Sequence, residues 1–389
     1  MNRIILLGAT GYTGSRVLSN LASMPQESDI VLVGRNSERL RQQAHTAGVE
    51  CETFQADASV PGALDSVLRK NDVLITTVGP FDELGREVAR SAARAGVVYL
   101  DSTGEPPFVE WMFRTLGPSA ASSGALLVPG FGYDYVPGNL AGWAVAERAG
   151  DNVAAIEVAY FLWRYDPRSK EPLRQPSLAE MLSATTTPGT RESLVKVFGA
   201  PSFAYRADFS DPFGLTAQRT GEKLLRFTAA GKQRSAITIG GSEHFGLPEV
   251  LPSLRCVDVG LGWFGSGATP LHYLVRMGGP LTANRFTRRL SSKVAQHLPN
   301  QDRMPSVPTR ISVTGRARDA SGNILSEVSV NGPGPYELTG DLLARAARHF
   351  ASREEHPIGV HGPLAALEPA TLVALGEQCG LTVQSIEGR

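Results

Sequence analysis

Cysteine is scarce in this chain, and its few copies stand far apart. Cys51, Cys256 and Cys379 form no Cys-x-x-Cys pair, so their spacing excludes a disulfide framework and the usual zinc motifs. None of the three stands beside a motif, which disfavours a catalytic cysteine. We therefore expect a cytoplasmic protein in a reducing setting, with no metal site.

An excess of charge of one sign is also lacking, since Lys plus Arg and Asp plus Glu number 38 each. No overall field therefore draws the protein to nucleic acid or to an anionic membrane. Apolar runs stay too short to span a membrane, and the first strand begins by Arg3, which leaves no room for a signal peptide. We expect a soluble protein with no transmembrane segment and no nucleic-acid partner.

What the sequence does have is glycine, at three spaced positions near the amino terminus. The run Gly8-Ala9-Thr10-Gly11-Tyr12-Thr13-Gly14 follows the apolar stretch Ile4–Leu7 and precedes a helix-like stretch. A dinucleotide site needs such glycines for a tight turn, for close approach of the pyrophosphate and for packing of helix on strand. The N–H groups at the helix start would hold the pyrophosphate. The predicted contacts are Gly8, Thr10, Gly11, Tyr12, Thr13 and Gly14.

The 389 residues, of which 42% are hydrophobic, are enough for two or three domains. Short β-rich runs alternate with helical stretches through the first third, which predicts an α/β domain with a doubly wound parallel sheet of the Rossmann type. Longer alternating runs follow from Val153 and predict an α+β domain with a mainly antiparallel sheet. The expected division is a dinucleotide-binding domain over residues 1–135, a substrate or oligomerisation domain over 136–339, and a C-terminal segment over 340–389 that returns to the first domain.

The second predicted strand ends in Val33-Gly34-Arg35-Asn36-Ser37, at the place where NAD sites carry an acidic residue. An arginine there would pair with a 2′-phosphate and stack on adenine, so NADP is the predicted cofactor. The alternative is that Arg35 is solvated and Ser37 only caps the next helix. Asp57, after the third strand, would accept a hydrogen bond from the adenine amine or cap the helix that follows.

Three more turns end strands at the edge where a doubly wound sheet binds its ligand. Val78-Gly79-Pro80-Phe81 follows the fourth strand and would bring backbone and an apolar side chain to the nicotinamide, or form only a tight turn. Asp101, Thr103 and Glu105 follow the fifth strand and are predicted to face the substrate, together with Tyr135 beyond the sixth strand. Asp101 could instead satisfy N–H groups of its own loop.

These segments together resemble the saccharopine dehydrogenase-like oxidoreductases, a family that includes trans-acting enoyl reductases. The resemblance extends over nearly the whole chain. It implies an NAD(P)-dependent enzyme that moves hydride to or from a C–N or C=C bond, with a Rossmann domain joined to an α/β domain. The motifs that carry it are Gly8–Gly14, Val33–Arg35, Thr77–Phe81, Tyr99–Glu105, Pro129–Pro137, Gly241–Pro248 and Leu261–Gly265.

Reduction of such a bond needs a proton donor near the hydride acceptor. No tyrosine is followed by lysine four positions later, which argues against the Tyr/Lys pair of short-chain dehydrogenases. Tyr133 is the first choice, because a phenol with a pKa of ~10 donates readily at neutral pH. Asp134 is a second candidate, although it could cap the next helix. His244 is a third, although a lone histidine between apolar residues is often structural.

The leading hypothesis is an NADP-dependent reductase acting on a C=C or C=N bond of a small metabolite or a carrier-linked acyl intermediate. A saccharopine-type amino-acid dehydrogenase is the alternative among enzymes, and it would need arginines such as Arg164, Arg168 and Arg174 to hold α-carboxylates. An NADP-binding regulatory or scaffolding protein without turnover is the alternative from another class. A homodimer is the expected assembly.

Overall fold

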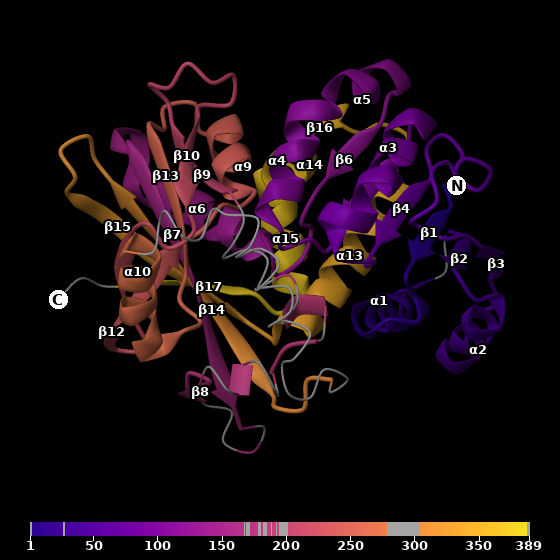
Figure 1. The fold of residues 1–389 in the computed structure, drawn as a ribbon, viewed down its shortest axis with the longest axis horizontal. Helices are drawn as coiled ribbons and strands as arrows, with labels where there is room; N and C mark the ends of the chain where they lie inside the picture. The colour runs from indigo at the N-terminus through magenta and orange to yellow at the C-terminus, as the bar shows by residue number, and fades with distance from the viewer. Residues whose placement is uncertain are drawn as a thin grey trace. The chain divides into compact units, whose positions relative to one another are not determined.

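A computed structural model gives the fold, and it describes residues 2–25, 28–166, 168, 172–177, 180–181, 185–187, 189–191, 193, 201–277 and 304–386. The chain forms two compact units, and each takes residues from two separate parts of the sequence. The first unit is Met1–Val136 with Pro335–Cys379, and the second is Pro137–Gly334 with Gly380–Arg389. Each unit is described by itself (Figure 1).

The first unit contains a seven-stranded sheet in the order β16-β6-β5-β4-β1-β2-β3, and every neighbouring pair is parallel. The order runs outward from β1 in both directions, as a doubly wound sheet requires. The predicted α/β class is therefore confirmed. The strands are β1 (Ile4–Leu7), β2 (Ile30–Gly34), β3 (Glu52–Gln55), β4 (Val73–Thr76), β5 (Val98–Asp101), β6 (Leu126–Val128) and β16 (Gly359–Val360).

Helices lie on both sides of this sheet, with α3 and α5 together on one side and α1 and α2 on the other (Figure 1). The central strands are apolar on both faces, because both faces are covered. The helical segments are α1 (Tyr12–Ser23), α2 (Ser37–Ala47), η1 (Phe81–Gly85), α3 (Arg86–Ala95), α4 (Pro106–Thr115), α5 (Gly117–Ser123), α13 (Pro335–Ala351), α14 (Pro363–Leu367) and α15 (Pro369–Gln378).

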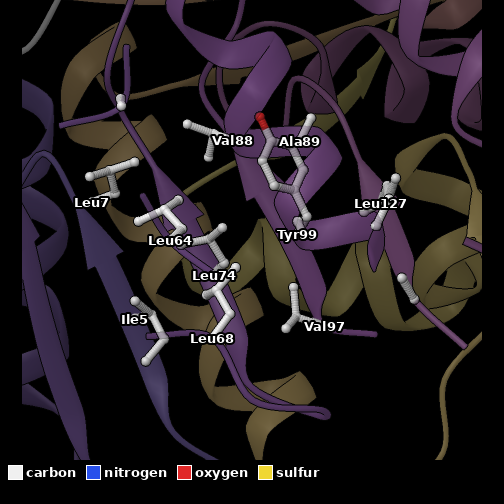
Figure 2. Close-up of a cluster of buried hydrophobic side chains, with 14 of the residues drawn as sticks. Ile5, Leu7, Leu64, Leu68, Leu74, Val88, Ala89, Val97, Tyr99 and Leu127 are labelled. Atoms are coloured by element: carbon white, nitrogen blue, oxygen red, sulfur yellow. The ribbon is translucent and has the colours of Figure 1, made fainter. Parts of the chain in front are cut away.

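The core on the α3 side joins the central strands to those helices. Figure 2 shows Ile5 and Leu7 of β1, Leu74 of β4 and Tyr99 of β5 in one layer, and all four are essentially inaccessible to solvent. Burial of such side chains is the main favourable term in folding. This layer fixes the ends of β1, β4 and β5, and therefore the loops that follow these strands.

Helix α13 completes the first unit from the far end of the sequence. It packs along α1, and the approach is close because a Cβ on Gly340 would lie 2.8 Å from the Cβ of Arg16. The C-terminal part of the chain thus supports the helix that follows the glycine-rich turn.

The second unit is built on a large mixed sheet in the order β10-β9-β13-β7-β14-β15-β17, to which β8, β11 and β12 are added. Strand β13 runs parallel to β7, and the other pairs are antiparallel. This agrees with the predicted, mainly antiparallel α+β arrangement. The strands are β7 (Ala155–Tyr165), β8 (Pro172–Arg174), β9 (Pro201–Arg206), β10 (Leu215–Arg219), β11 (Leu224–Ala229), β12 (Lys232–Thr238), β13 (Cys256–Leu261), β14 (Thr309–Arg318), β15 (Ile324–Gly332) and β17 (Thr382–Ser385).

Helical segments of the second unit pack on this sheet, and Gly315 of β14 shows how closely, since a Cβ there would lie 2.5 Å from the carbonyl oxygen of Ala141 in α6. The segments are α6 (Val136–Ala149), η2 (Gly150–Asn152), α9 (Glu243–Val250), η4 (Gly265–Gly267) and α10 (Ala268–Met277). The sequence pattern of residues 178–185 predicts a further helix, and most of these residues lie outside the part that the structure describes. In the part of the chain that the structure describes, no helix is both long and apolar enough for a bilayer crossing.

The last strand is placed differently from the prediction, which returned the whole segment 340–389 to the first domain. Strand β17 pairs with β15 of the second unit, with Val383 opposite Val330. All four residues of β17 are exposed, so backbone pairing rather than an apolar face decides where it lies. A hydrophobic pattern carries no information about such a strand.

Candidate functional site

The turn after β1 is formed by backbone rather than by side chains. Gly8 has a φ of 98°, a conformation that favours glycine. A Cβ on Gly8 would lie 2.7 Å from the Oγ1 atom of Thr77, in the loop after β4. The N–H of Gly11 donates to the Gly8 carbonyl over 3.0 Å and closes the turn.

Gly14 allows α1 to approach β1, since a Cβ there would lie 2.1 Å from the carbonyl oxygen of Gly8. Helix α1 begins at Tyr12 with no side-chain cap and no acidic residue in its first turn. The first N–H groups of a helix have no acceptor within the helix and carry the positive end of its dipole. The turn is therefore a backbone cradle at the positive end of a helix, as a pyrophosphate site requires.

The aromatic ring of Tyr12 is held at the mouth of this cradle. The Arg16 guanidinium lies 3.7 Å from the ring centroid, and the ring of Tyr336 from α13 meets it edge-on at 5.2 Å. Thr10 is exposed and Thr13 is half-buried in the same turn. The predicted pyrophosphate contacts therefore lie together, around the start of α1.

Arg35 and Asp57 lie at one corner of the sheet, beyond β2 and β3. Arg35 is exposed. The Asp57 carboxylate accepts hydrogen bonds from the N–H and the hydroxyl of Ser59, over 2.9 and 2.8 Å. These bonds, and then attraction to Arg35, lower the pKa of Asp57. A cation and an ionised carboxylate thus lie beyond β2 and β3, and contact with a 2′-phosphate and an adenine amine stays a prediction.

Asn36 and Ser37 have local partners in this corner. The side-chain oxygen of Asn36 accepts from the N–H of Arg39 over 3.0 Å and caps α2. The Ser37 hydroxyl donates to Gln55 over 3.3 Å. The helix cap that was considered for Ser37 is therefore supplied by Asn36, because the N-cap residue precedes the first helical residue.

The loop after β4 is held by Glu105. Its two carboxylate oxygens accept from the N–H groups of Phe81 and Asp82, each over 3.0 Å. Val78 is half-buried and Gly79 is exposed, whereas Phe81 is buried with its ring 5.7 Å from that of Phe108. Glu105, predicted to face the substrate, thus has both oxygens engaged by the backbone of this loop.

Asp101 ties the loop after β5 to the loop after β6. It is fully buried, and its Oδ1 atom accepts from the N–H groups of Thr103 and Gly130, over 2.9 and 2.8 Å. The Thr103 hydroxyl in turn accepts from the N–H of Glu105 over 3.2 Å. Burial raises the pKa of Asp101 to about 6 in spite of these bonds. Of the two roles considered for Asp101, the geometry favours loop support.

The loop after β6 carries the predicted tyrosines, and both are buried. The N–H of Tyr133 donates to the Thr339 hydroxyl of α13 over 3.0 Å, and the ring of Tyr135 covers Gly130, where a Cβ would lie 2.5 Å from Cδ2. Thr339 also covers Gly132, at 2.7 Å from an added Cβ. Helix α13 therefore sets the position of this loop.

Asp134 lies between these tyrosines and is only half-buried. Its carboxyl rests against the backbone of Gly104, where a Cβ would lie 2.8 Å from Oδ2. Protein surrounds the carboxyl and withdraws it from water, which raises the pKa of Asp134 to about 7. A carboxyl with this pKa can both hold and release a proton near neutrality.

His244 belongs to the second unit, where it lies in the first turn of α9 and is fully buried. Its Nδ1 atom is 3.1 Å from both the N–H and the carbonyl of Gly241, and its ring meets that of Phe203 at 5.4 Å. Burial lowers the pKa of His244 to about 4, so the ring is neutral at pH 7. These contacts agree with a structural histidine.

Three residues that support the first unit's site were not among the predicted site residues, although Thr77 stands in the family motif Thr77–Phe81. Thr77 packs against Gly8, Tyr336 packs against Tyr12, and Thr339 bonds Tyr133, which precedes it by 206 positions. A threonine after a strand and two residues at the start of a helix carry no local signal of these contacts.

The fold and the glycine cradle define a class, the proteins with a dinucleotide-binding domain of the Rossmann type. Residues 4–128 match the family model of the saccharopine dehydrogenase NADP binding domain. The resemblance and the NADP cofactor expected from the sequence are thereby confirmed.

Similar proteins of assigned function include trans-acting enoyl reductases. A trans-acting enoyl reductase from Mycobacterium leprae is 36% identical over 140 residues, which are 35% of this chain and 34% of that protein. One from Mycobacterium ulcerans is 29% identical over 226 residues, which are 57% of this chain and 51% of that protein. The matched segments thus span between a third and a half of these relatives.

A solved structure matches over the whole chain. Saccharopine dehydrogenase (L-Glu forming) from Saccharomyces cerevisiae has a TM-score of 0.62 at 15% identity, and the match covers 100% of both chains. At this identity the likeness shows the shared fold, including the second unit's sheet, and not a shared reaction.

Proposed function

We propose that the protein is an NADPH-dependent reductase that transfers hydride to a C=C or C=N bond of a small metabolite or a carrier-linked acyl intermediate. The observation that carries the proposal is the glycine cradle at α1, with the exposed Arg35 beyond the neighbouring strand β2. Both belong to a domain of the NADP-binding family.

Bound NADPH would supply the hydride, and the chain's own residues would hold and complement it. The first turn of α1 binds the pyrophosphate, and Arg35 pairs with the 2′-phosphate. Glu105 fixes the loop Val78–Phe81, whose exposed Gly79 leaves room for close approach of the nicotinamide. Tyr133 and Asp134, in the loop after β6, are the candidate proton donors.

The two possible acceptors are favoured by different comparisons. The curated relatives are named as trans-acting enoyl reductases, which favours a C=C bond and, with it, a carrier-linked acyl substrate. The family model that matches residues 4–128 is named for saccharopine dehydrogenase, which favours a C–N bond. We carry both, because the cradle and the loops after β4, β5 and β6 suit either reaction.

The amino-acid dehydrogenase alternative finds less support among its candidate arginines. Arg164 and Arg174 each form an ion pair with Glu180 over 2.7 Å. Both guanidinium groups are therefore already paired with a carboxylate of the protein. Arg168 donates its backbone N–H to Asp166. A site for substrate α-carboxylates would need these guanidinium groups to be released or supplied elsewhere.

The activity is tested by NADPH oxidation with a panel of enones, enoyl thioesters, cyclic imines, and 2-oxo acids mixed with amines. We expect consumption of NADPH with at least one C=C or C=N compound. Tight NADPH binding without turnover across the panel would instead favour the regulatory or scaffolding alternative. Once a substrate is found, unchanged turnover in Tyr133→Phe would remove Tyr133 as the proton donor.

A homodimer in the cytoplasm completes the proposal. The dimer and the cytoplasmic location are both expectations from the sequence. Light scattering on the purified full chain measures the assembly directly, and a monomeric mass at working concentration would contradict the expected dimer.

A further inference from the structure

Three acids, Asp101, Glu105 and Asp134, lie at or just beyond the carboxyl ends of β5 and β6. Two of them have a structural role, because they accept backbone hydrogen bonds. Asp101 accepts two backbone N–H groups on Oδ1. Glu105 uses both of its oxygens on the N–H groups of Phe81 and Asp82. These hydrogen bonds hold the loops after β4, β5 and β6 in place. Asp101 and Glu105 therefore use their carboxylates to support the protein backbone.

Asp134 differs from both. Among the described residues, its carboxyl has no hydrogen-bond or ion-pair partner, and its Oδ2 atom lies beside Gly104, 2.8 Å from where a Cβ would stand. A polar group withdrawn from water normally finds a partner. Asp134 also keeps some exposure, so a ligand or water can reach it from outside.

The charges around Asp134 are few. The loops that end β4, β5 and β6, over residues 77–80, 102–105 and 129–135, contain no Lys, Arg or His. Besides Asp134, the acids in these loops or at the ends of their strands are Asp101 and Glu105, and burial is the cause of the raised pKa of Asp134. No basic side chain of these loops therefore holds the carboxyl in its ionised form.

The position of Asp134 in the fold suggests what its unpartnered carboxyl does. Ligands of a doubly wound sheet bind in the crevice outside the carboxyl ends of its strands. The loop of Asp134 follows β6 at that edge and is tied by Asp101 to the loop after β5, next to β4. A dinucleotide whose pyrophosphate lies at α1 extends its nicotinamide along this edge.

We propose that Asp134 is the acid and base of the reaction, with its carboxyl facing the nicotinamide side of the crevice. This inference rests on the proposed function. Hydride from NADPH forms a C–H bond at one atom of the double bond, and the Asp134 proton is transferred to the other. The π bond is lost, NADPH becomes NADP⁺, and the Asp134 carboxylate takes up a proton from water through its exposed side.

The test compares the titration of Asp134 in two complexes of the full-length protein. The oxidised nicotinamide ring carries a positive charge and the reduced ring does not, while the phosphates are the same. A positive charge nearby favours the ionised carboxylate. Carbon NMR of protein labelled at aspartate Cγ follows the titration, with saturating NADP⁺ in one sample and NADPH in the other.

We expect one aspartate whose titration midpoint is lower with NADP⁺ than with NADPH. Its resonance should be absent in Asp134→Asn, while Asp101→Asn, the matched control, should retain it. Equal midpoints in the two complexes would overturn the inference and leave NADP binding intact. Failure to bind either form of the cofactor would overturn the proposed function itself, so the two failures are distinguishable.

Discussion

At the scale of single residues, Asp134 makes a prediction that needs no substrate. Its pKa is raised to about 7 in the folded protein, against ~3.9 for an unfolded aspartate. Its favourable contribution to stability is therefore complete below pH ~4 and declines as the pH rises through 7. Asp134→Asn removes this loss, so its melting temperature should exceed that of the wild type at pH 8.

The same comparison at pH 4 is the control, because there the folded-state carboxyl is protonated and the unfolded one is about half protonated, so most of the advantage of Asp134→Asn should disappear. Thermal unfolding at the two pH values measures it. A melting temperature of the variant below that of the wild type at pH 8 would show that the ionised carboxylate has a stabilising partner.

The residues whose contacts are local in sequence were the easiest to predict from the sequence. The glycines of the first turn have a pattern that only close backbone packing explains, and the structure places Gly8 and Gly14 in contact. Glu105 was predicted to face the substrate. Its carboxylate instead accepts from two backbone N–H groups that lie 24 and 23 positions away in the sequence. No spacing rule reports such a bond.

At the scale of elements, the approach of α1 to β1 depends on Gly14. In Gly14→Ala the new methyl group meets the Gly8 carbonyl, so the helix must move. We expect a loss of stability of about 1–3 kcal/mol and a marked loss of NADPH affinity, measured by denaturant unfolding and by cofactor fluorescence. Gly117→Ala in α5 is the control, since nothing lies within 4 Å of its added Cβ.

Helix α13 gives a second prediction at this scale. Thr339→Val keeps the shape of the side chain but removes the acceptor of the Tyr133 N–H. An unpaired buried N–H costs about 1–3 kcal/mol, which urea unfolding would measure. Thr339→Ser retains the hydroxyl and should lose less stability. An equal loss in both variants would mean that methyl packing, not the hydrogen bond, holds the loop.

At the scale of the whole molecule, the alternation of strands and helices in residues 4–128 was enough to predict the parallel sheet, because each β-α step is local in sequence. Long-range contacts were harder to predict. Helix α13 (Pro335–Ala351) joins α1 (Tyr12–Ser23) across most of the chain, and β17 joins β15 with Thr382 opposite Asn331. Exposed β17 has no apolar face, and the apolar face of α13 does not identify the helix that it packs against.

The central claim is that the first unit binds NADP through the cradle at α1 and Arg35. The most direct measurement is the affinity of the full chain for NADPH and NADH, for wild type and Arg35→Ala, with Arg39→Ala as the control on exposed α2. We predict tighter NADPH binding, and a loss of this preference on the order of 10- to 100-fold in Arg35→Ala only. Equal affinity of the wild type for NADPH and NADH would contradict the account.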